Sequence, residues 1–123
     1  MNYDDLYENF IETVPKAKEF CEPLVKADGV DKSDGMHWFF GVYVVPFIMH
    51  IDENDDIETM EQIASFLEMA ETSGQEDIAG VIEQSVMESI LDKRKEIVSK
   101  YSSLWGSETK AAFKAVGEYI TPI

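Results

Sequence analysis

The longest stretch without a formal charge, residues 35–51, constrains the fold of this chain more than any other feature. As a helix, these 17 residues would span about 25 Å, which is short of the roughly 30 Å hydrocarbon core of a bilayer. The stretch also contains two histidines and a proline, and acidic residues flank both of its ends. It therefore predicts a buried central helix in a soluble, cytoplasmic protein.

The same stretch contains Tyr43, Val44 and Val45, whose side chains would also suit a β-strand. Its length favours a helix, and we expect Pro46 to kink that helix. No second convincing strand is present in the sequence, and an isolated strand cannot satisfy its backbone hydrogen bonds. A helix is therefore the better interpretation.

Apolar residues elsewhere recur at the i, i+3, i+4 spacing of one helical face. The predicted helices cover residues 3–14, 15–25, 36–51, 57–72, 75–90, 97–105 and 107–120, with a kink or break at Pro23. A chain of 123 residues, 45% of them hydrophobic, is long enough for one core. The sequence predicts a single all-α domain over residues 1–123, with six to seven short helices arranged as a bundle or as solenoid-like stacked hairpins.

Two of these helices predict particular buried faces. The helix 57–72 is expected to bury Ile57, Met60, Ile63, Ala64, Leu67 and Ala70. The helix 75–90 is expected to bury Ile78, Val81, Ile82, Ser85, Ser89 and Ile90.

The chain is strongly acidic, with 25 Asp and Glu against 10 Lys and Arg and a net charge of −15. Residues 33–92 hold 14 acidic side chains and no Lys or Arg. The net charge is −4 over residues 1–32 and +3 over residues 93–123. Direct binding to a phosphate backbone needs a basic footprint, which this composition does not supply. A peripheral anchor on an anionic membrane is disfavoured for the same reason.

Asp52, Asn54 and Asp56 have the spacing of the first half of a calcium-binding loop. However, Ile57 and Ile63 stand where that loop needs its glycine and its bidentate glutamate. We therefore expect a turn that caps the next helix, and no metal ion.

Catalytic motifs are also missing from the sequence. His37 and His50 lack the neighbouring ligands of a zinc or di-iron site, and the single cysteine, Cys21, lies on an apolar face and is expected to be buried. There is no phosphate-binding loop, nucleophile elbow or Cys-x-x-Cys. The sequence predicts no enzyme, no catalytic residue and no cofactor.

On the predicted helix 57–72, Glu58, Glu61 and Glu68 lie on the side away from the apolar stripe. None of them has a Lys or Arg four residues away, so none gains the usual pairing within a helix. Such a face can serve solubility alone, or it can attract a basic partner.

The order of these features resembles a family of small, acidic, all-helical bacterial proteins that includes immunity proteins of contact-dependent inhibition and related polymorphic toxin systems. The resemblance rests on His37, Phe40-Gly41, Pro46, Phe66-Leu67-Glu68, Val86, Glu88, Ile90, Tyr101 and Leu104-Trp105-Gly106. It implies an all-helical fold and a role in binding a toxin.

The leading hypothesis is therefore an immunity protein that neutralises a cationic toxin, most naturally a nuclease domain, through its acidic surface. The expected contact residues are Asp52, Glu53, Asp55, Asp56, Glu58, Glu61 and Glu68, with Trp38 or Tyr43 as an aromatic anchor if its ring is exposed. A helical regulatory or scaffolding domain is the alternative, and it predicts an exposed apolar groove. A small enzyme or ligand-binding protein would instead need a pocket near His37, His50 and Trp38.

Overall fold

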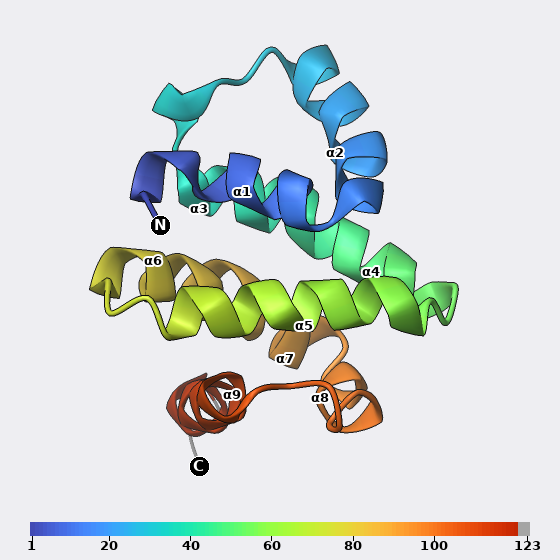
Figure 1. Ribbon diagram of the computed structural model, residues 1–123, viewed down its shortest axis with the longest axis vertical. Coiled ribbons are helices and arrows are strands. Elements are labelled where there is room, and N and C mark those ends of the chain that lie inside the picture. The colour runs from blue at the N-terminus through green and yellow to red at the C-terminus, as the bar shows by residue number, and fades with distance from the viewer. Residues whose placement is uncertain (121–123) are drawn as a thin grey trace.

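In a computed structural model, which describes residues 1–120, the N-terminal helices (blue) lie at one end of the longest axis of the molecule and the C-terminal helices (red) at the other (Figure 1). The elements are η1 (Tyr3–Asp5), α1 (Leu6–Thr13), α2 (Pro15–Asp28), η2 (Lys32–Asp34), α3 (Met36–Phe39), η3 (Phe40–Val44), α4 (Val45–Glu53), α5 (Ile57–Glu71), α6 (Glu76–Val81), η4 (Ile82–Met87), α7 (Glu88–Lys93), α8 (Glu96–Lys100) and α9 (Ser107–Ile120). Residues 1–120 include no strand, which confirms the all-α prediction. No helix in this part of the chain is both long enough and apolar enough to cross a membrane.

Two long helices are each interrupted by a π-helical segment. Elements α3, η3 and α4 run continuously over residues 36–53, and α6, η4 and α7 do so over residues 76–93. The segments η3 and η4 contact each other, and His37 Nδ1 lies 2.7 Å from Ser85 Oγ between the two helices. Counting each long helix once gives seven helices in the described residues, as the periodicity predicts.

The predicted central helix over residues 36–51 is confirmed and lies in the core. Tyr43 and Phe47 on this helix are among the largest fully buried side chains. Pro46 follows the π-helical segment η3, and a proline lacks the N–H that an α-helix needs at this point. Pro23 does not break α2, which continues without interruption to its last residue.

The second π-helical segment changes which residues of its helix are buried. Val86 and Met87 are fully buried, whereas the predicted core positions Ser85 and Ser89 are only partly buried. A π-helical turn takes up an additional residue, so the α-helical period points to the wrong face at Ser85 and Ser89, whereas the predicted core residue Ile90 is fully buried.

The core is centred on aromatic rings from four elements. Phe10 of α1 contacts Phe40, Phe47 and Phe66, with ring centroids 5.0–6.2 Å apart and the rings edge to face. This packing fixes α5 against α1 and the central helix. The opposite side of α5 packs against α9, so α5 lies between the two ends of the molecule.

Candidate functional site

The predicted contact residues begin in the turn between α4 and α5, where Asp52, Glu53, Asp55 and Asp56 form what we call the acidic turn. Asp56 caps α5, because its carboxylate accepts the Thr59 N–H at 3.1 Å and the Thr59 hydroxyl at 2.6 Å. Asp55 has a positive φ of 51°, a conformation that aspartate tolerates better than most residues. The expected capping turn is therefore confirmed.

Asp52 is the buried centre of the acidic turn. Its carboxylate accepts hydrogen bonds from Lys100 Nζ at 2.9 Å, the Tyr101 hydroxyl at 2.8 Å and Arg94 Nη1 at 3.3 Å. Burial raises the pKa of Asp52, but these donors outweigh burial and hold the pKa below its usual value. Asp52 thus joins α4 to the chain around α8, and it does not offer its carboxylate to a partner.

The other acidic side chains of the turn also meet cations of the same chain. Arg94 Nη2 donates to Glu53 at 3.0 Å, and Lys100 Nζ donates to Asp55 at 2.8 Å. Lys16 Nζ lies 2.7 Å from Asp56 Oδ2, and its hydrogen bond is the main reason that the pKa of Asp56 falls to about 2. Three cations from outside residues 33–92 therefore match most of the charge of the acidic turn.

The three glutamates of α5 that were expected to contact a partner lie in two different environments. Glu58 and Glu61 are exposed, and neither takes part in an ion pair within the described residues. Glu68 instead turns towards α9, where it accepts the Thr109 N–H at 2.9 Å, the Thr109 hydroxyl at 2.8 Å and the Glu108 N–H at 3.3 Å. Its carboxylate therefore caps α9 and is not free for a partner.

The two predicted aromatic anchors also differ in exposure. Trp38 on α3 is 49% exposed, whereas Tyr43 is buried. The Tyr43 hydroxyl donates to Asp28 at 2.6 Å, and this hydrogen bond is the main cause of its raised pKa. Tyr43 is a core residue, so of the two rings only that of Trp38 meets the condition of exposure.

The outward side of α5 carries apolar side chains that the sequence pattern did not identify. Ile57, which was expected to be buried, is 57% exposed, and Met69 is 46% exposed. At about 100° per residue, Ile57, Glu58, Glu61, Ser65 and Met69 all fall within an arc of about 120°. We call these five residues the α5 face.

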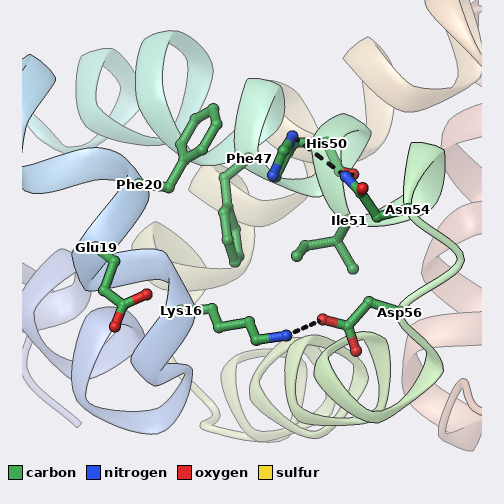
Figure 2. Close-up of a pocket in the computed structure, with 8 residues that line it drawn as sticks. All are labelled: Lys16, Glu19, Phe20, Phe47, His50, Ile51, Asn54 and Asp56. Carbon is green, nitrogen blue, oxygen red and sulfur yellow. Dashed lines mark hydrogen bonds and ion pairs between the residues drawn. The ribbon is translucent and has the colours of Figure 1, made fainter.

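Beside the acidic turn, a cleft of about 630 Å³ opens between α2 and α4 (Figure 2). Phe20, Phe47 and Ile51 supply apolar walls, and the Lys16–Asp56 ion pair closes one side. The full lining is Lys16, Glu19, Phe20, Phe47, His50, Ile51, Asn54 and Asp56.

His50 lies at the rim of this cleft with its ring 5.1 Å from that of Phe20, and its Nδ1 is 3.4 Å from Asn54 Nδ2. Neither His37 nor Trp38 lines the cleft. The structure therefore does not bring together the three residues that the ligand-binding hypothesis placed in one pocket.

A second group of carboxylates lies where α5, η4 and α9 meet, and the sequence pattern did not single it out. We call Glu68, Glu71, Glu83 and Glu108 the glutamate junction. Burial and the nearby Glu83 raise the pKa of Glu71 to about 8, and Glu68 and Glu108 add to this effect. The sequence does show that neither Glu71 nor Glu83 has a Lys or Arg within four residues, so neither carboxyl group can pair with a cation on its own helix.

The remaining reactive groups are held in structural contacts. The Cys21 thiol is buried and donates to the Tyr43 carbonyl at 3.5 Å, and burial raises its pKa to about 12. Within residues 1–120, the His, Cys, Asp and Glu side chains form no group of three or more that could hold a metal ion.

The chain matches no family model, no curated protein and no solved structure. The resemblance to immunity proteins therefore stays a prediction, and the function has to be inferred from the surfaces described above.

Proposed function

We propose that this protein is an immunity-type inhibitor, a non-enzymatic cytoplasmic protein that neutralises a bacterial toxin with a basic surface. A nuclease domain is the partner with the best-matched chemistry, because it must itself attract a phosphate backbone. The observation that carries the proposal is the α5 face, where exposed Ile57 and Met69 flank carboxylates without ion-pair partners in the described chain.

The composition of the α5 face is suited to binding another protein. Interfaces combine an apolar centre with a polar rim, and Ile57 has Asp55, Asp56 and Glu58 as its neighbours in the sequence. Ile57 and Asp55 also line a small hollow of about 150 Å³ beside Tyr101. A side chain of the partner could fill this hollow and cover Ile57.

The overall charge supports rapid capture of a basic partner. The ion pairs of the acidic turn are internal, so they leave the net charge of −15 unchanged. A field of this sign accelerates association with a basic protein and weakens as salt is added. Glu58 and Glu61 would then make the direct contacts that the acidic turn itself does not offer.

The direct test uses the toxin domain that this proposal expects to be encoded beside the gene for this protein. We expect its association rate with the wild type to fall at least tenfold between about 50 and 300 mM salt. The double variant Glu58→Lys, Glu61→Lys should lose most of the binding and should no longer protect cells from the toxin. Ile57→Asp should increase the dissociation rate, because it places a charge at the apolar centre.

The matched control is Glu12→Lys, Glu118→Lys, which makes the same change in net charge at exposed positions on α1 and α9. It should slow association moderately and retain protection. Binding that is insensitive to salt, or equal losses in both double variants, would contradict the assignment to the α5 face.

A regulatory or scaffolding domain is the second candidate, and exposed apolar residues on the central helix favour it. Trp38 is 49% exposed and Val42, one turn later, is 38% exposed. Under this alternative, Trp38→Ala would abolish binding to the cellular partner, and the lysine substitutions on α5 would not.

A further inference from the structure

The glutamate junction contains a carboxyl group that cannot be satisfied while it is charged. Glu71 Oε2 is fully enclosed by protein and has no hydrogen-bond donor among the described residues. The Glu83 carboxyl of η4 acts on Glu71 across this contact, and as a carboxylate it can only accept hydrogen bonds. A hydrogen bond between Glu71 and Glu83 therefore requires one of the two groups to carry a proton.

Glu68 cannot supply that proton. Its two oxygens already accept two backbone N–H groups and one hydroxyl at the start of α9. Burial raises the pKa of Glu68, but these three donors outweigh burial and keep the pKa below its usual value. Glu68 and Glu71, one turn apart on α5, are thus held in opposite protonation states by their surroundings.

None of the four glutamates of the junction takes part in an ion pair within the described residues. The charged groups that act most strongly on Glu71 are Glu68 from α5 itself, Glu83 from η4 and Glu108 from α9. All three are acidic. The elements α5, η4 and α9 pack against one another here. If Glu71 and Glu83 were both charged, their repulsion would therefore act on all three of these contacts.

We propose that Glu71 and Glu83 share one proton that holds α5 against η4 where α9 packs on both, and that losing this proton loosens α9. When the proton passes to solvent, two carboxylates remain side by side without a donor between them. The repulsion between the two carboxylates acts at the place where α9 packs against α5 and η4. This device is independent of the proposed toxin binding, since neither Glu71 nor Glu83 belongs to the α5 face.

The direction of the pH dependence follows from the raised pKa of Glu71. The unfolded chain loses this proton near pH 4.5, whereas the folded protein keeps it up to about pH 8. The folded state then binds more protons, so the stabilisation is complete below pH 4.5. It decreases as the pH rises and is lost once the pH passes about 8.

The test compares thermal unfolding of the wild type and Glu71→Gln at pH 6 and pH 9. We expect the wild-type Tm to fall by at least about 4 °C over this range. The amide introduced by the substitution can donate to the Glu83 carboxylate without titrating, so the variant should lose most of this fall. Glu12→Gln, which removes an exposed carboxylate, should keep the fall of the wild type.

A second measurement uses the wild type and does not depend on any variant folding. A ¹³C NMR titration should show the Glu71 carboxyl changing protonation near pH 8, while Glu68 stays ionised down to below pH 4.5. The proposal is overturned if Glu71 titrates near pH 4.5, or if Glu71→Gln keeps the full pH dependence of Tm.

Discussion

The acidic turn and the glutamate junction lie at the two ends of α5, and each gathers four carboxylates. In the acidic turn, Lys16, Arg94 and Lys100 arrive from distant parts of the chain and pair with them. In the junction, the compensation comes from backbone N–H groups and, we propose, from one shared proton. Two regions of similar composition therefore depend on pH in opposite directions.

Because cations from distant parts of the chain pair with one of these regions, a count of charges along the chain does not locate an interaction surface. The acidic turn is the densest run of carboxylates in the sequence, yet cations 40 or more residues away occupy it. Of the seven predicted contact carboxylates, Glu58 and Glu61 are the two that neither pair with a cation nor cap a helix in the described residues. Removing one group from each region tests how each is held together.

The largest effect is expected from Asp52→Ala. Asp52 is buried and accepts hydrogen bonds from Lys100, Arg94 and Tyr101, so its removal leaves these donors without their shared acceptor. We expect a loss of about 2–4 kcal/mol in the free energy of unfolding, measured by urea denaturation.

The matched control is Asp92→Ala, which removes an exposed aspartate that takes part in no ion pair of the described residues. Its free energy of unfolding should stay within about 0.5 kcal/mol of the wild type. A loss for Asp52→Ala no larger than that of the control would mean that the turn is not held together by its buried carboxylate.

An intermediate effect is expected from Gly106→Ala at the other end of α5. A Cβ at this position would collide with the Glu68 side chain, and Glu68 is held by its three bonds to the start of α9. The new methyl group should displace Glu68 and weaken the cap of α9. We expect a loss of about 1–2 kcal/mol in the free energy of unfolding.

A double-mutant cycle separates this collision from a general cost of replacing glycine. In a Glu68→Ala background the obstacle is absent, so Gly106→Ala should cost almost nothing there. An equal cost in both backgrounds would show that the backbone, and not the contact with Glu68, requires the glycine.

The sequence predicted the fold well because the fold depends on local periodicity. The seven helices and the buried central helix follow from apolar spacing that holds over one or two turns. The errors occur where that spacing fails, since the π-helical segment η4 buries Val86 and Met87 in place of Ser85 and Ser89. Ile57 was assigned to the core because it fits the helical stripe, but it is the first residue of α5 and lies outside the packed region.

The candidate site was predicted less well, because its state depends on partners that are distant in sequence. In the sequence, Glu68 has the same solvent-facing position on its helix as Glu58 and Glu61, and Asp52 belongs to the turn that precedes this helix. Only the contacts with Lys100 of α8 and Thr109 of α9 show that the carboxylates of Asp52 and Glu68 are used within the fold. The helical pattern likewise contains nothing to show that Glu71 meets Glu83.

The smallest effect is expected from Asp56→Asn, and it tests the opposite pH dependence of the acidic turn. The pKa of Asp56 lies at about 2, below its value in the unfolded chain, so its stabilisation is present above about pH 4 and is lost as the pH falls towards 2. The asparagine of the variant can still cap α5, because its side-chain oxygen can accept the Thr59 N–H. The charged contact with Lys16 disappears, and the Thr59 hydroxyl, which donates to Asp56 Oδ2 in the wild type, can accept a hydrogen bond from the new amide group. The urea midpoint of the variant should therefore lie slightly below that of the wild type at pH 5, and the two should converge by pH 2.

Lys16→Met should reproduce most of this small difference, since it removes the same ion pair from the other side. If instead the gap between Asp56→Asn and the wild type widened towards pH 2, the pairing with Lys16 could not be its cause, because protonation would already have abolished that contact.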